Sequence, residues 1–202
     1  MKLAVAFAAA AVAAPVHTLT PIQFGLDIKD AGGSSSLLVA WGRITPQPRL
    51  AILRAPRRPA DAAPPLLAAM LMHTPTSTDL AASRLALASG GRRLYVVPVA
   101  HGPLAVALVP DGVVDFASRL PHRLVWLSLE QTQTGTVAAG IARDGVTKID
   151  VIAAGATHRA ALGRNGYIAV LPGLRAKQVE ALLVTTTGGR YRLPLDRSEF
   201  TR

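Results

Sequence analysis

The stretch of sequence that decides the fold is Val137-Ala138-Ala139-Gly140-Ile141-Ala142-Arg143-Asp144-Gly145-Val146-Thr147-Lys148-Ile149-Asp150-Val151. Before Asp144-Gly145, Val137, Ala139 and Ile141 alternate with smaller or polar residues, and after it Ile149 and Val151 alternate with Lys148 and Asp150. A period of two is typical of a strand that buries one face. Asp-Gly favours a turn because both residues tolerate positive φ at low cost. The stretch therefore predicts two antiparallel strands joined by a tight turn.

The same pattern continues toward the carboxy terminus. Turn signals stand at Ala154-Gly155, Asn165-Gly166 and Gly188-Gly189. The further apolar or alternating segments are residues 157–162, 167–171, 179–183 and 191–195. Six short strands at spacings of about ten residues are typical of a β-sandwich. We therefore expect residues 134–202 to form a small immunoglobulin-like β-sandwich, in which a one-residue slip of register would expose each buried set.

Residues 15–133 predict an amino-terminal α+β module, so that the whole chain is mainly β with minor α. Strands are expected where apolar residues alternate or run together. These segments are residues 22–28, 37–41, 83–87, 94–99, 104–109 and 124–129. Gly90-Gly91 indicates a hairpin turn between the third and the fourth of them.

A proline-rich stretch interrupts this module. Six prolines lie between Pro46 and Pro65, and we expect extended, irregular structure there because proline fixes φ and lacks a backbone donor. A helix is expected over residues 66–72. Asp61 is its candidate N-cap, with prolines in the first turn.

Residues 1–14 are similar to a secretory signal. Met1-Lys2 precedes twelve apolar residues, and Ala11-Val12-Ala13 fits the small-x-small pattern of a cleavage site. The run is shorter than the roughly 20 residues that a helix needs to cross the hydrocarbon core of a membrane. An Ala-rich helix packed on the mature core is the alternative. We expect an exported protein, extracellular or in the cell envelope, without a membrane span.

The charge of the chain indicates acidic partners. It has 22 Lys and Arg against 12 Asp and Glu, a formal net charge of +10, and such a surplus attracts polyanions. The arginines are scattered and aromatic residues amount to 4%, which argues against a basic nucleic-acid tail and against a stacking platform for single strands. The basic residues that do cluster form our candidate polyanion-binding set, Arg54, Arg57, Arg58, Arg92 and Arg93.

Sequence motifs for catalysis or for cofactor binding are not found. The absence of Cys excludes disulfides and thiolate sites. The five histidines are well separated, and neither H-E-x-x-H, G-x-S-x-G nor a glycine-rich phosphate loop occurs. We therefore expect no metal site and no cofactor. The residues from which a hydrolase site could still be assembled are Ser83, His101, Asp111 and His122.

Several segments carry a resemblance to a known group of proteins. They are residues 53–61, 83–86, 91–98, 140–146 and 164–167. Over about residues 50–195 the chain resembles uncharacterised exported Ala/Arg-rich proteins of GC-rich actinobacteria. The resemblance implies export and a β-rich fold, and it implies no activity.

Together these features favour a non-enzymatic exported or cell-envelope protein that acts as a binding or structural module. An envelope polymer or a protein would be its partner. Two alternatives stay open: an envelope hydrolase with a site in the middle of the chain, and a basic polyanion binder.

Overall fold

Over the residues that the structure describes, the fold is mainly β, with three sheets and a few short helices. It is seen in a computed structural model that describes residues 16–18, 21–22, 36–41, 50–72, 78–98, 104–111, 113–117 and 124–195. The signal-like residues 1–14 and most of the strand expected at residues 22–28 lie outside these ranges. The sandwich-type β architecture that the alternating pattern predicts is present.

The first sheet has five strands in the order β1–β15–β14–β10–β11. Its strands are β1 (Val16–Thr18), β15 (Gly189–Pro194), β14 (Val179–Thr186), β10 (Val146–Ala153) and β11 (Ala156–Arg159). All neighbours pair antiparallel except β1 and β15, which are parallel. Four of the five strands come from the carboxy-terminal pattern of alternating residues.

The second sheet has six strands in the order β12–β13–β9–β8–β3–β2. Its strands are β12 (Ala161–Leu162), β13 (Gly166–Pro172), β9 (Gly135–Ala142), β8 (Val125–Thr132), β3 (Ser36–Trp41) and β2 (Pro21–Ile22). The expected domain boundary at residue 134 falls between β8 and β9, which are paired along their whole length. This sheet therefore contains strands from both sides of that boundary.

The third sheet has four strands in the order β4–β5–β6–β7. Its strands are β4 (Arg84–Ser89), β5 (Arg92–Pro98), β6 (Leu104–Val109) and β7 (Val113–Ala117). The turn between β4 and β5 has φ of 58° at Gly90 and 76° at Gly91, a conformation that glycine adopts without steric cost. The predicted hairpin at Gly90-Gly91 is confirmed.

The helices are short. Those within the described ranges are α1 (Ala51–Arg54), α2 (Pro65–Met72) and the 3-10 helices η1 (Pro59–Asp61), η2 (Leu80–Ala82) and η4 (Ala176–Gln178). The helix expected over residues 66–72 is confirmed as α2. Helices α1 and η1 form within the proline-rich stretch that was expected to be irregular throughout. The expectation that Asp61 caps α2 is wrong, because Asp61 ends η1 and its carboxylate accepts hydrogen bonds elsewhere.

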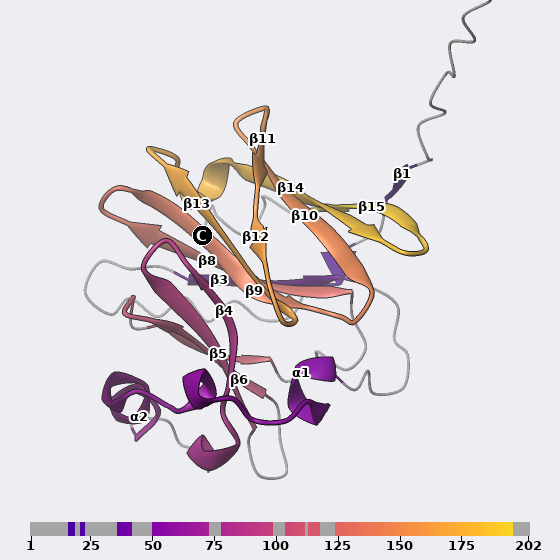
Figure 1. Cartoon of the computed structure of the whole chain (residues 1–202). Coiled ribbons are helices and arrows are strands. Elements are labelled where there is room, and N and C mark those ends of the chain that lie inside the picture. Colours follow the sequence, from indigo (N-terminus) through magenta and orange to yellow (C-terminus); the bar gives the residue numbers. More distant parts are fainter. Residues whose placement is uncertain are drawn as a thin grey trace, which may run out of the picture.

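Three apolar cores hold the elements in layers (Figure 1). One core lies between the five-stranded and the six-stranded sheet, and Ile149, Leu129 and Leu182 belong to it. A second core lies between the six-stranded and the four-stranded sheet, with Ile141 and Val96 among its members. The third joins the four-stranded sheet to α2. The six-stranded sheet is thus covered on both faces, and every residue of β9 is buried. Within the described ranges, the five-stranded sheet has one face in a core and the other uncovered.

Candidate functional site

The uncovered face of the five-stranded sheet carries a group of basic side chains. On β10, Ile149 and Val151 point into the core. Their neighbours Lys148 and Asp150 point to the outside because successive side chains of a strand alternate between the two faces. The same rule places Arg190 and Arg192 of β15 outside, since Leu193 packs in the core and Tyr191 packs against it.

Cross-strand register brings these residues together. Asp150 is directly opposite Leu183 on β14 and Arg159 on β11. Leu183 is in turn opposite Arg192 on β15. In the next row, Thr185 is opposite both Lys148 and Arg190. Residues that face each other across a ladder share one side of the sheet. We call Lys148, Arg159, Arg190 and Arg192 the cationic face.

Asp150 is the carboxylate among these four cations. Its Oδ2 atom is 2.7 Å from Lys148 Nζ, and its Oδ1 atom is 3.6 Å from the nearest guanidinium nitrogen of Arg159. Burial raises the pKa of Asp150 above its ordinary value, and the positive charge of Arg190 opposes part of that rise. The side chain of Asp150 is 4% exposed, while those of Lys148 and Arg159 are 38% and 63% exposed. The cations, and not the carboxylate, therefore present their charge to solvent.

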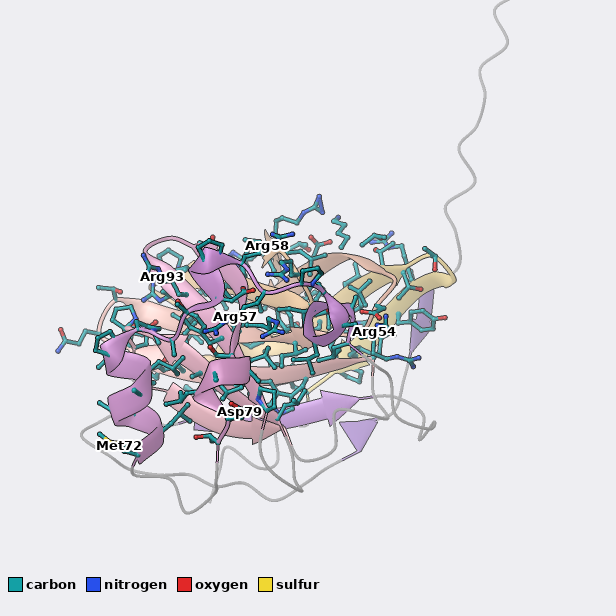
Figure 2. All side chains as sticks on the ribbon, turned by 60° about the horizontal axis from the view of Figure 1, so that its bottom comes forward. Arg54, Arg57, Arg58, Met72, Asp79 and Arg93 are labelled. Carbon is teal, nitrogen blue, oxygen red and sulfur yellow. The ribbon has the colours of Figure 1, made fainter. Side chains whose placement is uncertain are left out.

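The arginines expected from sequence are placed differently. Arg54 pairs with Asp144 at 3.0 Å and Arg92 pairs with Asp111 at 2.8 Å, so two of the five charges are balanced. Arg57, Arg58 and Arg93 are exposed. In Figure 2, Arg93 and Arg54 lie well apart, with Arg57 and Arg58 between them. The set is spread over α1, the segment that follows it and β5, and polyanion binding by it stays a prediction.

A second charged cluster is buried where η1 meets β4. The Asp61 carboxylate accepts hydrogen bonds from the backbone N–H groups of Arg58 (2.8 Å) and Leu85 (3.0 Å). It also forms an ion pair with Arg164 at 3.0 Å. Burial alone would raise the pKa of Asp61, but these two backbone hydrogen bonds and the Arg164 charge together lower it. The cluster joins segments about 100 residues apart in the chain, and these contacts of the Asp61 carboxylate are all with other residues of the fold.

The residues of the hydrolase alternative are described only in part. The Ser83 hydroxyl is buried and donates a 2.7 Å hydrogen bond to the carbonyl oxygen of Asp61. Asp111 is the partner of Arg92. His101 and His122 lie outside the described residues. The contacts of Ser83 and Asp111 support the local fold.

An open hollow of about 410 Å³ lies between α1 and the turns at Asp144 and Asn165. Asp144 Oδ1 accepts a hydrogen bond from the N–H of Ala51 at 2.9 Å, and Asn165 Oδ1 accepts one from the N–H of Ile52 at 3.0 Å. These side chains therefore satisfy the first backbone donors of α1. The polar groups of this hollow hold α1 against the sandwich.

The described ranges hold neither a candidate metal site nor a helix suited to a membrane span. They contain no group of three or more His, Asp or Glu residues arranged to hold a metal ion. Among the helices in these ranges, none has the length and the apolar character needed to cross a bilayer.

Comparisons with protein-family models, with curated proteins and with solved structures find no match for this chain. The resemblance to exported actinobacterial proteins therefore stays a prediction, and the candidate site is defined by its own geometry.

The cationic face was not among the expected sites. The signal that could have revealed it is the polar half of the alternating pattern, in which Lys148, Arg190 and Arg192 each stand next to core residues. About 40 residues separate the segments 148–150 and 190–192 in the chain, so only the pairing of β10, β14 and β15 makes them neighbours.

Proposed function

We propose that this chain is a non-enzymatic exported or cell-envelope protein that binds an acidic partner through its β-sandwich. The observation that carries the proposal is the cationic face: four basic side chains surround one shielded carboxylate on a sheet face that no described element covers. The net charge of +10 supports it, because a surplus of positive charge attracts acidic molecules over distance.

Export is supported by the signal-like residues 1–14. A charged start, an apolar run and small residues at a cleavage position are the features that the secretion machinery reads. An acidic polymer of the cell envelope would then be within reach of the protein.

We also propose that the sandwich is of the immunoglobulin type and that α1, α2 and the four-stranded sheet belong to an amino-terminal α+β module. Immunoglobulin domains place strands A, B, E and D in one sheet and C, F and G in the other. If β8 to β10 are read as A to C, β12 and β13 as D and E, and β14 and β15 as F and G, the orders β12–β13–β9–β8 and β10–β14–β15 agree with this scheme. The α+β module is supported by the packing of α2 on the four-stranded sheet.

Two measurements on the full chain test this function. The first is fractionation of cells that express the chain with and without residues 1–14; we expect the full chain outside the cytoplasm and the shortened chain inside it. The second is co-sedimentation of the purified protein with cell-envelope material at low and high salt. Binding should weaken steeply with salt, because each neutralised charge releases a counterion. Retention of the full chain in the cytoplasm, or no binding at low salt, would contradict the proposal.

A further inference from the structure

We infer that the cationic face binds a linear phosphodiester polymer that carries no bases. This inference rests on the proposed function and names the chemistry of the acidic partner. It is carried by three properties of the face: the kind of cation, the spacing of the cations, and the residues that stand between them.

The cations are mostly arginine. Three of the four residues, Arg159, Arg190 and Arg192, carry guanidinium groups, whose planar fork donates two parallel hydrogen bonds to a phosphate or a carboxylate. Within the described chain, neither Arg190 nor Arg192 forms an ion pair with a carboxylate. Arg190 acts on Asp150 through its charge, and the guanidinium donors of Arg190 and Arg192 are the contacts that we assign to the ligand.

The spacing of the cations suits a regular chain of charges. Arg190 and Arg192 are two residues apart on β15, which places their Cα atoms about 7 Å apart along the strand. Lys148 lies two strands from Arg190, or roughly 10 Å across the sheet. Six covalent bonds separate successive phosphorus atoms in a polymer of three-carbon phosphodiester units. At the advance per bond of an extended chain this repeat is about 7 Å, which matches the spacing of the two arginines.

The residues between the cations argue against nucleic acid. Binding of single strands uses aromatic side chains on which bases stack. The outward positions of the described strands between the cations hold Leu183 and Thr185, whereas Tyr191 is turned toward the core. A polymer without bases needs no such stacking platform.

The same residues argue against a membrane surface. Proteins that lie on a bilayer insert large apolar side chains beside their basic ones. On the uncovered face only Val16, at the end of β1, belongs to the exposed large apolar residues of the described chain. Charge pairing, and not insertion, is thus the interaction that this face offers.

The test is equilibrium binding of the full chain to fluorescent poly(glycerol phosphate) over a range of salt concentrations. The variant Arg190→Gln/Arg192→Gln removes two charges from the cationic face. The matched control Arg175→Gln/Lys177→Gln removes two exposed charges at η4, outside the cationic face, and leaves the net charge equal. We expect the first variant to lose about tenfold or more in affinity at low salt, and its slope of log affinity against log salt to fall by about 1.4 to 1.8. The control should stay within about threefold of the parent chain.

Further variants and ligands separate the possible outcomes. Arg190→Lys/Arg192→Lys keeps the two positive charges but removes the planar guanidinium groups, and we expect an affinity between those of the parent chain and the Gln variant. Circular dichroism of each variant checks the fold, and Lys148→Gln replaces the double variant if that variant unfolds. Equal losses in the face variant and the control, or tighter binding to polygalacturonate, to single-stranded DNA or to anionic vesicles, would overturn the inference while leaving binding of an acidic partner in place. No binding to any of these polymers would overturn the proposed function itself.

Discussion

Asp61 and Asp150 are both buried carboxylates beside basic residues, yet the fold shifts their pKa values in opposite directions. Asp61 is 0% exposed and Asp150 is 3% exposed. The pKa of Asp61 is nevertheless lowered, and that of Asp150 is raised. The difference lies in the donors: Asp61 accepts two backbone hydrogen bonds in addition to its ion pair, whereas the partners of Asp150 among the described residues are the side-chain cations Lys148 and Arg159.

This comparison separates a structural cluster from a surface that can bind. Backbone donors are fixed by the fold, and both carboxylate oxygens of Asp61 have partners within it. The cations around Asp150 outnumber their carboxylate, and the surplus charge stays available to a ligand.

The largest effect is expected for Asp61→Asn. The amide keeps one acceptor but places an NH₂ group against donors, and Arg164 loses its partner. Breaking one side of a buried ion pair costs about 3–5 kcal/mol, so the free energy of unfolding in urea should fall by that amount. The matched control is Asp79→Asn, where Asp79 caps η2 at the surface by accepting from the N–H of Ala82. Asn and Asp cap equally well, and the control should change by less than about 0.5 kcal/mol. Equal effects would show that the cluster at Asp61 has no special role.

Acid should remove the contribution of Asp61. Because its folded pKa is lowered, the stability it provides is present above the ordinary value of 3.8 and is lost as the pH falls through the folded pKa. The difference in unfolding free energy between the parent chain and Asp61→Asn should therefore be constant from about pH 5 to 7 and narrow below about pH 4. The stability contributed by Asp150 depends on pH in the opposite direction. Because its folded pKa is raised, that contribution is present below 3.8 and is lost as the pH rises through the folded pKa. A difference that grows in acid would contradict the assignment for Asp61.

Asp150→Asn should leave stability nearly unchanged and tighten the binding of a polyanion. Its charged form is not favoured by the fold, so we expect the unfolding free energy at neutral pH to change by less than about 1 kcal/mol. Removal of one negative charge about 7 Å from a bound phosphate in water is worth about 0.6 kcal/mol, or roughly threefold in affinity. Titration with poly(glycerol phosphate) at low salt measures this gain. Weaker binding would mean that the main effect of Asp150 is to position Lys148 for the polymer, and that its repulsion of the polymer is the lesser effect.

Sequence patterns could predict the strands and the turns but not the layers. The alternation in segments 137–151 and 179–195 depends only on neighbouring residues, and there the expected strands match β9, β10, β14 and β15. The turn at Asn165 was also predictable, because Asn tolerates its observed φ of 61°. The pairing of β3 with β8 joins segments about 90 residues apart, and local periodicity contains no information about such a partner.

The cluster at Asp61 and the cationic face could not be predicted from the sequence for a related reason. Asp61 follows Pro59 and precedes a run of apolar residues, a local pattern equally compatible with a helix N-cap. Its contact with Arg164, 103 residues away in the chain, decides otherwise. The cationic face likewise exists only through the register of β10, β11, β14 and β15. Clusters of consecutive basic residues, the feature visible in sequence, turned out to be partly neutralised by Asp111 and Asp144.

The smallest effect is expected for Arg54→Gln. Its ion pair with Asp144 joins side chains that are 55% and 39% exposed, and such surface pairs contribute about 0.2–1 kcal/mol. Asp144 keeps its hydrogen bonds from the Ala51 N–H and the Asn165 side-chain amide, so α1 should stay in place. Urea unfolding should show this small loss at low salt and almost none at high salt, where the charges are screened. Polymer binding should stay within about twofold of the parent chain, because a balanced arginine adds little to the field that a polyanion meets. If Arg54→Gln instead weakened binding as much as Arg192→Gln, the binding surface would lie on the arginines near α1, and the contrast between the cluster at Asp61 and the face around Asp150 would lose its functional meaning.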